Sequence, residues 1–386
     1  MIALGEALAR RGHLVTLETW SRWRAEVQGA GMQFVAAPKY PVFPTRERPL
    51  KPYEAVTLAT VETRRALVDA QPDVVVHDIL TLAPALAAEL EGVPAGTLIP
   101  HVHPATANGF PAYASGARLP RTAAGRAIWN RVTTRVRRGL EQGRDELNDT
   151  RRRVGLEPID RVHGGISERL CMVATFPQLE YPRAWPPGTH IVGPLAWEPP
   201  YHRVAPPPGP EPLLLVAPST AQDPQHRLLL DSLAGLRDEP VRVLATWNRR
   251  PLPRPAPVGP RQRLVEWISY AQTMPGCALV ICNAGHGTMA RALASGAPVL
   301  AVPHAGDMNE NAARLDWAGA GLRLPWPLLS PVTLRLAVRQ ALRTPGLAAR
   351  AAELARWSAA NRGAERASDL VEQLASGASA AAPVLG

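Results

Sequence analysis

The stretch that decides the fold runs from residue 278 to residue 312. It reads ALVIC (278–282), NAGHGT (283–288), MARALASG (289–296), APVLAVP (297–303), HAGD (304–307) and MNENA (308–312). The five apolar residues at its start are typical of a strand buried on both faces of a parallel sheet. A glycine-rich loop, a helix, a second apolar strand, a polar loop and a second helix follow. This alternation predicts a parallel α/β sheet in this part of the chain.

The loop over 283–288 has the composition of an anion-binding turn. Gly285 and Gly287 allow the backbone to turn tightly and to approach a ligand closely. Unpaired N–H groups at the start of the following helix attract phosphate. A tight turn without any ligand would explain the loop alone equally well. Asp307 and Asn311 favour a binding site, because they follow the next strand at the edge where open α/β sheets bind ligands.

Alternating strands and helices extend outward from this stretch in both directions. The second half has further predicted strands at 213–217, 241–247, 264–268 and 321–324, and the first half at 13–19, 31–37, 73–78, 93–99, 170–176 and 190–193. Such alternation predicts doubly wound parallel sheets. Residues 194–212 are dense in proline, which cannot join a sheet interior and makes a stiff spacer.

The proline-rich spacer predicts two domains with a cleft between them. We expect a first domain over 1–193, a linker over 194–212 and a second domain over 213–345. Helices over 346–375 would return to the first domain, and the tail over 376–386 would be disordered. Each domain would bind one substrate, and the two substrates would meet in the cleft.

Composition excludes several classes of protein. The net charge is +10 over 386 residues, but the basic residues are almost all arginine and are scattered along the chain, which argues against a nucleic-acid partner. Cys171, Cys277 and Cys282 contain no C-x-x-C pair, and we expect buried, reduced thiols and no bound metal. No window is apolar over the length of a membrane span. We therefore expect no stable membrane insertion and a cytoplasmic enzyme.

The chain resembles glycosyltransferase family 1 of the GT-B fold, and most of all the bacterial enzymes that glycosylate natural products. The family patterns H-G-G-x-G-T, G-x-P-V/M-x-x-x-P and D-Q-x-x-N-A keep their spacing between Asn283 and Ala312. The segments RGHLVT (11–16), DILT (78–81) and AAELEGVP (87–94) extend the match. The resemblance implies an α/β protein with two Rossmann-like doubly wound domains that face each other across a cleft.

The resemblance also implies a reaction: inverting transfer of a sugar from a nucleotide-diphosphate sugar to a hydrophobic natural-product acceptor. It implies neither a metal nor a cofactor, and the sequence agrees in having no two Asp residues separated by one position. The resemblance is compatible with either a monomer or a homodimer. The alternative is a catalytically inactive protein that binds sugar nucleotides.

The family pattern implies a donor site in the second half of the chain. Gly285, Gly287 and Thr288 match the diphosphate cradle, while Asp307 matches the acid that holds hydroxyls of the donor sugar. The full set of implied donor-binding residues is Ser219, Thr220, Trp267, Ile268, Asn283, Gly285, His286, Gly287, Thr288, Asp307, Met308 and Asn311. Two simpler interpretations stay open: Trp267 as a core residue, and Asp307 as a helix N-cap.

Four positions depart from the family pattern. Asn283 replaces a His, Ala284 replaces a Gly, Arg291 replaces an acid that bonds ribose hydroxyls, and Met308 replaces a Gln. The replacement of Gly by Ala at position 284 is mild if the φ angle of that residue is negative. Fewer polar partners for ribose and sugar favour a dTDP-deoxysugar over UDP-glucose as the donor.

The start of the chain also departs from the family. Asp78 matches the acid that orients the catalytic His, but that His belongs to a strand and a G-H-x-x-P loop that the sequence does not contain. The start could be placed too late, the product could be shortened and inactive, or another base could serve. His101 and His103 are the alternative bases, and with Phe110 they are the expected acceptor-side residues. Without the strand, the first sheet would have a gap at its middle.

Overall fold

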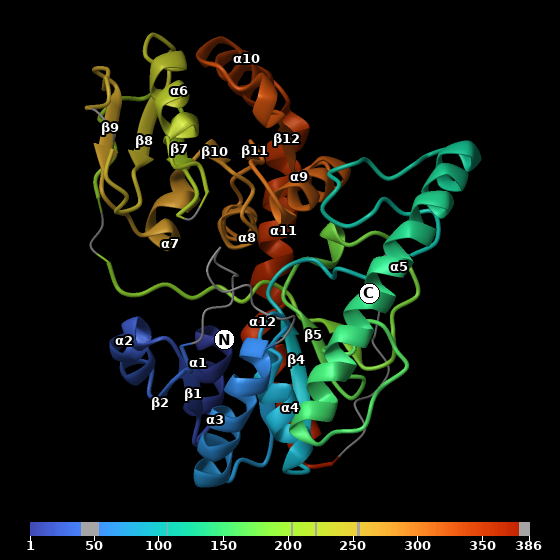
Figure 1. The fold of residues 1–386 in the computed structure, drawn as a ribbon. Coiled ribbons are helices and arrows are strands. Elements are labelled where there is room, and N and C mark those ends of the chain that lie inside the picture. Colours follow the sequence, from blue (N-terminus) through green and yellow to red (C-terminus); the bar gives the residue numbers. More distant parts are fainter. Residues whose placement is uncertain (40–53, 106, 202–203, 221, 253–254, 378–386) are drawn as a thin grey trace, which may run out of the picture.

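The computed structural model describes residues 1–39, 54–105, 107–201, 204–220, 222–252 and 255–377 (Figure 1). Its strands and helices form two α/β regions, one above the other in Figure 1, connected by an extended segment without helix or strand in the described part of 194–212.

The second region has one six-stranded parallel sheet. Its strands are β7 (Leu213–Ala217), β8 (Arg242–Thr246), β9 (Gln262–Val265), β10 (Leu279–Cys282), β11 (Val299–Ala301) and β12 (Gly321–Arg323). Their order is β12-β11-β10-β7-β8-β9, so the direction of winding reverses between β7 and β10. In open α/β sheets this reversal is the place where ligands bind, because the loops after the two strands diverge there.

Both faces of this sheet are covered, which explains the unbroken apolar strands. Leu215 and Val280 pack into the core on one face, and Leu214 and Ile281 pack into the core on the other. All five residues of β7 are buried. The covering helices are α6 (Arg227–Gly235), α7 (Tyr270–Thr273), α8 (His286–Ala294), α9 (Asp307–Trp317), α10 (Pro331–Leu342) and α11 (Pro345–Ala360).

In the described part of the first region, six strands form two sheets. A two-stranded parallel sheet holds β1 (Thr16–Thr19) and β2 (Gln33–Ala36). A four-stranded parallel sheet has the order β3-β4-β5-β6 and consists of β3 (Val75–Asp78), β4 (Ala95–Ile99), β5 (Cys171–Val173) and β6 (Thr189–Ile191). The sequence predicted one sheet with a gap at its middle, and over the described residues the two groups of strands do not pair.

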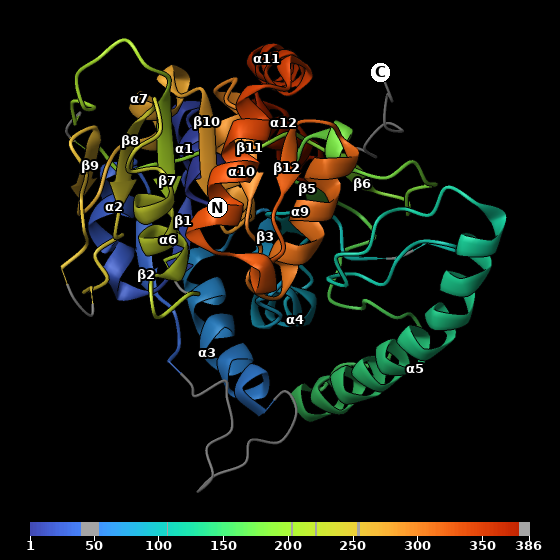
Figure 2. The ribbon, with the colours of Figure 1, turned by 90° about the horizontal axis from the view of Figure 1, so that it is seen from above.

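The helices of the first region are α1 (Ile2–Arg10), α2 (Arg24–Gly29), α3 (Glu54–Ala70), α4 (Ala83–Leu90) and α5 (Ala123–Val154). The long helix α5 lies at the periphery of the molecule (Figure 2). The side chain of Thr122 accepts a hydrogen bond from the Gly125 N–H at its start, and Gly155 ends it in the left-handed conformation. Short 3-10 turns occur at Ser21–Trp23, Pro177–Leu179, Met274–Gly276 and Trp326–Leu328.

The last helix, α12 (Gly363–Ala375), packs against the first region. Its residues Ala367 and Val371 share a core cluster with Leu4 of α1 and Leu98 of β4. Outside that core, Arg11 donates hydrogen bonds to Glu365, Asp369 and Glu372 of α12, which joins the start of the chain to its end.

Candidate active site

The loops after β7 and β10 meet at the reversal point of the second sheet. Asn283 is buried and connects them: its Oδ1 accepts a hydrogen bond from the Ser219 N–H at 2.8 Å, and its Nδ2 donates to the carbonyl of Val302 at 3.2 Å. The Asn that replaces the family's His therefore spans the ends of three strands, and its amide bonds to protein groups. Thr220, the next residue of the first loop, is exposed.

The loop after β8 joins the same edge. Asn248 Nδ2 donates to the carbonyl of Pro218, and Arg250 donates to the carbonyl of Gln222 at 2.6 Å. Asn248 and Arg249 both adopt the left-handed conformation, which reverses the chain directly after the strand. These contacts hold the loops after β7 and β8 together.

The start of α8 is open to solvent on its glycine face. A Cβ added at Gly285 or Gly287 would meet no atom within 4 Å, so a ligand can approach the backbone N–H groups there. Ala284 has a φ of 61°, and it is buried. The condition for a mild Gly-to-Ala replacement was a negative φ, and the structure does not meet it. The left-handed alanine costs about 1 kcal/mol.

His286, the first residue of α8, faces the first region. Its Nε2 lies 3.0 Å from Thr175 Oγ1, and its ring also hydrogen-bonds the backbone of Pro100. Burial, with a smaller contribution from the nearby His101, lowers the pKa of His286 to about 3. The imidazole is therefore neutral and connects the two regions, and its ring nitrogens bond to protein groups.

Asp307 and Asn311 lie together at the start of α9. Asn311 Nδ2 donates to Asp307 Oδ2 at 3.2 Å and to the carbonyl of Ala284 at 3.0 Å. Gly306 is the N-cap residue of α9, and Asp307 makes no capping bond, so the N-cap interpretation of Asp307 is wrong. A half-buried carboxylate at a helix start is stabilised by the helix dipole.

Two predicted donor residues turn out to be core residues. Met308 is 7% exposed and Ile268 is 2% exposed, and both belong to the apolar core beside the second sheet. The side chain of Met308 is therefore not available to a sugar, because a helix start that places Asp307 toward solvent points the next residue inward. Only the backbone of Ile268 can contribute to binding.

Trp267 is half-buried and is not a member of the described core clusters. Its ring lies 5.6 Å from the ring of Tyr201, and the guanidinium of Arg249 stands 5.2 Å from its centroid. Within the described residues, the buried Trp267 Nε1 has no hydrogen-bond partner. An indole placed in this way fits a binding surface better than a core residue.

The predicted site residues of the first region lie in separate surroundings, unlike those of the second region. Asp78 ends β3, and its Oδ1 accepts a hydrogen bond from the Leu80 N–H at 2.8 Å. The amine of Met1 is close to it: burial lowers the pKa of that amine, and the charge of Asp78 opposes the effect. Phe110 packs edge-on against Tyr181.

His101 and His103 have different surroundings. His101 is half-buried, and its Nδ1 lies 2.7 Å from the carbonyl of Val102 and 3.4 Å from the Tyr113 hydroxyl. His103 is 1% exposed, its Nδ1 accepts from the Ala105 N–H, and burial lowers its pKa to about 3. A residue so enclosed does not reach an acceptor, so the expectation for His103 is wrong.

A buried network of charges between the two regions was not predicted. Arg314 of α9 donates to Glu180 Oε2 and to Glu310 Oε1, each at 2.8 Å, and Glu180 also accepts from the His103 N–H at 2.6 Å. Burial raises the pKa of Glu180, while the charges of Arg314 and Arg183 oppose that shift. Arg314 and Glu180 lie 134 positions apart, so no local pattern in the sequence could have indicated that pair.

Tyr113 is a further residue at the contact between the two regions. It packs against the core of the second sheet, although it belongs to the loop that follows β4. Burial raises the pKa of its phenol, and the charge of Asp307 adds to the shift. Tyr113 therefore brings the first region to the start of α9.

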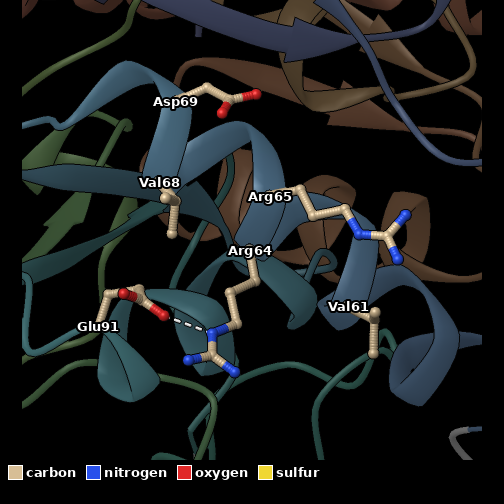
Figure 3. Close-up of a pocket in the computed structure, with 6 residues that line it drawn as sticks. All are labelled: Val61, Arg64, Arg65, Val68, Asp69 and Glu91. Atoms are coloured by element: carbon tan, nitrogen blue, oxygen red, sulfur yellow. Dashed lines mark hydrogen bonds and ion pairs between the residues drawn. The ribbon is translucent and has the colours of Figure 1, made fainter.

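A hollow on the surface of the first region lies elsewhere (Figure 3). It is formed by α3 and the end of α4, and Arg64 and Glu91 form an ion pair across it. Its other lining residues are Val61, Arg65, Val68 and Asp69. None of the predicted site residues lines it. Within the described ranges, no group of three or more His, Cys, Asp or Glu residues could hold a metal ion.

Two α/β regions with parallel sheets, and polar loops at the reversal point of the second sheet, form the architecture of the GT-B fold. Solved structures of this class support the fold: the glycosyltransferase of kitacinnamycin has a TM-score of 0.75 at 19% identity, over 97% of this chain and 94% of that one. The glycosyltransferase VinC in complex with dTDP has a TM-score of 0.68 at 21% identity, over 97% and 96% of the two chains.

The chain belongs to the family of bacterial natural-product glycosyltransferases. It is 30% identical to O-mycaminosyltylonolide 6-deoxyallosyltransferase of Streptomyces fradiae, over 97% of this chain and 94% of the relative. It is 28% identical to 4'-demethylrebeccamycin synthase of Lentzea aerocolonigenes, over 97% and 96%. Residues 227–373 match the model of the erythromycin biosynthesis protein CIII-like C-terminal domain.

The protein is therefore an enzyme that transfers a sugar to a natural-product acceptor. In the described part of the chain, none of the helices has both the length and the apolar character required to span a bilayer.

Proposed function

We propose that the enzyme uses a dTDP-deoxysugar as its donor and transfers the sugar, with inversion and without a metal, to a hydrophobic acceptor. The observation that carries the proposal is the pairing of an open helix start at Gly285 and Gly287 with the carboxylate of Asp307. The first offers N–H donors to a diphosphate, and the second offers acceptors to sugar hydroxyls. The solved VinC complex with dTDP supports the choice of nucleotide.

Without a metal, protein groups must stabilise the leaving diphosphate. The N–H groups at the start of α8 are fixed by the helix before the reaction begins, and Thr288 in its first turn adds a hydroxyl donor. The dipole of a helix contributes about 0.3–1 kcal/mol at an exposed site, so direct hydrogen bonds supply most of the stabilisation. Inversion corresponds to one displacement, in which the acceptor attacks the anomeric carbon as the diphosphate leaves.

We assign the two substrates to different domains. The first domain, over 1–193, binds the acceptor, and Asp78 there matches the acid that orients the catalytic His in the family pattern. The second domain, over 213–345, binds the donor, with 194–212 as the linker. The helices over 346–375 return to the first domain, and the packing of α12 against α1 supports that division. The proposed location is the cytoplasm, and three unpaired, buried cysteines agree with reducing conditions.

Titration calorimetry with dTDP, dTDP-glucose and UDP tests the donor proposal. We expect dTDP to bind more tightly than UDP, and EDTA to leave binding unchanged. In Asp307→Asn, the affinity for dTDP should persist, while the additional affinity that the glucosyl group provides should fall about tenfold, since a charge-assisted hydrogen bond is lost. Asp316→Asn is the matched control, because Asp316 lies on the same helix and pairs with Arg118.

A clear preference for UDP would overturn the choice of nucleotide. Loss of the glucosyl contribution in both variants would place the sugar somewhere other than Asp307. Binding of dTDP-sugars without transfer to any acceptor in a panel of polyketide aglycones would favour the inactive sugar-nucleotide-binding protein.

A further inference from the structure

The linker places one carboxylate beside the helices of the second domain. Glu198 is 14% exposed at its side chain, and its Oε2 accepts hydrogen bonds from Arg291 Nη1 at 2.8 Å and from the Ala271 N–H at 3.1 Å. Arg291 also donates to the carbonyl of Trp197 at 2.7 Å. Figure 1 shows the linker running beneath α7 and α8, which carry Ala271 and Arg291. These bonds fix the position of Glu198.

The other oxygen of this carboxylate is unused. Among the described residues, Glu198 Oε1 is buried and has no hydrogen-bond partner. An unsatisfied buried polar atom is unfavourable, and most of all on a charged group, so such atoms usually bond to a ligand or a water. An acceptor in this position requires a donor group such as a hydroxyl.

Two half-buried aromatic rings, tilted by 52° to each other, lie near Glu198 along the linker and the loop after β9. Tyr201, three residues further along the linker, has its ring 5.6 Å from Trp267, and Arg249 stands 5.5 Å from the Tyr201 ring. Trp267 Nε1 is a second buried polar atom without a partner in the described part of the chain. Aromatic faces with a guanidinium beside them bind flat heteroaromatic rings, since such rings stack and cations attract their π electrons.

The order of these groups follows the order of parts in a nucleoside diphosphate. Thr288 and Arg291 are three residues apart on α8 and therefore share one face of the helix. Along that face, the open helix start comes first, then the Arg291–Glu198 pair. The cluster of Tyr201, Trp267 and Arg249 lies beside α7, whose Ala271 N–H also bonds Glu198. The corresponding parts of the ligand are the diphosphate, the pentose and the base.

We propose that Glu198 is a specificity-determining residue for the donor nucleoside, and that its Oε1 accepts a hydrogen bond from the 3′-hydroxyl of the pentose. Tyr201 and Arg249 hold the base against Trp267. The inference rests on the proposed function, because it names the linker residues that complete the same donor site. The family pattern has an acid at position 291, where this chain has an arginine. Glu198 then supplies a carboxylate from the linker, directly beside Arg291.

Binding of dTDP and 2′,3′-dideoxythymidine diphosphate to the full chain tests this assignment. The wild type should bind dTDP about tenfold more tightly, because the analogue lacks the hydroxyl that Glu198 accepts from. Glu198→Ala should bind the two ligands equally, and Glu198→Gln should keep an intermediate ratio. Glu211→Ala is the matched control: Glu211 lies in the same linker and also has a buried unpartnered oxygen within the described ranges, but it neighbours Arg261. It should keep the wild-type ratio.

The ratio of the two affinities distinguishes a contact with the 3′-hydroxyl from a purely structural role of Glu198. A structural defect weakens the binding of both ligands in the same variant and leaves their ratio unchanged. Equal binding of both ligands by the wild type, or a tenfold ratio kept in Glu198→Ala, would overturn the role of Glu198 while leaving the donor proposal intact. No binding of dTDP or UDP by the wild type would instead reject the donor proposal. If Glu198→Ala does not fold, the wild-type ratio decides together with Tyr201→Ala, which should weaken dTDP about tenfold and leave inorganic pyrophosphate unaffected.

Discussion

The two domains are built from the same units but differ in the continuity of their sheets. In the second domain, six strands form one sheet with apolar cores on both faces, and β7, β10 and β11 are buried throughout. In the first domain, β1 and β2 form a separate pair of strands, and each of their residues is half-buried or exposed. A continuous sheet fixes the loops at its edge, so the donor loops are mutually bonded. The divided sheet leaves Asp78 and His101 without a shared network among the described residues.

The largest expected loss of stability comes from a substitution at the interface of the two domains. Arg314→Met removes the cation between two buried carboxylates: Glu310 loses the ion pair with Arg314, and Glu180 keeps only its longer contact with Arg183. We expect a loss of about 3–5 kcal/mol in the free energy of unfolding, because a buried charge without its partner is strongly unfavourable. Urea denaturation followed by circular dichroism measures the loss.

The control for this variant is Arg118→Met, which breaks an ion pair in which the arginine side chain is largely exposed. Its cost should be below about 1 kcal/mol. Equal costs for the two substitutions would show that the buried network does not hold the domains together.

A second pair of variants compares the two sheets directly. Leu215 of β7 is fully buried, whereas Leu17 of β1 is half-buried. Leu215→Ala should cost about 2–5 kcal/mol, since it leaves a cavity in a packed core. Leu17→Ala should cost roughly 1 kcal/mol, because less apolar surface returns to water. The shift in urea midpoint at pH 7 measures both, and a larger shift for Leu17→Ala would contradict the difference in packing.

Acid should weaken the protein through its buried imidazoles. Burial lowers the pKa of His286 to about 3 in the folded state, while the ordinary value is 6.5. Between these values the unfolded chain binds a proton that the folded chain refuses, so stability is complete above pH 6.5 and falls as the pH decreases. At pH 5 the loss is roughly 2 kcal/mol for one such His.

His286→Gln should therefore reduce the loss of stability between pH 7 and pH 5 by roughly 2 kcal/mol, as measured by urea midpoints at both values. Thr175→Val removes the hydrogen bond to the ring but keeps the imidazole buried. It should retain the acid sensitivity of the wild type. An unchanged sensitivity in His286→Gln would mean that the ring is protonated or exposed in solution.

The outcome at individual residues shows where sequence patterns reach their limit. The apolar run 279–282 and the glycines after it predicted a central strand and an open helix start, and both are present. Met308 was assigned to the sugar site from its place in a motif, yet it faces the core. A motif fixes spacing along the chain, whereas the direction of a side chain depends on where its helix begins and on what packs against it.

The sequence alone indicated the class of fold, the buried strand over 279–282 and the proximity of Asp307 to the glycine loop. These features depend on hydrophobic periodicity and short-range spacing, which act within a few residues. Only the tertiary structure decided that His286 bridges the domains, that Glu180 meets Arg314, and that the linker brings Glu198 to Arg291. Such contacts join distant parts of the chain, and burial and charge pairing select them only after both domains have formed.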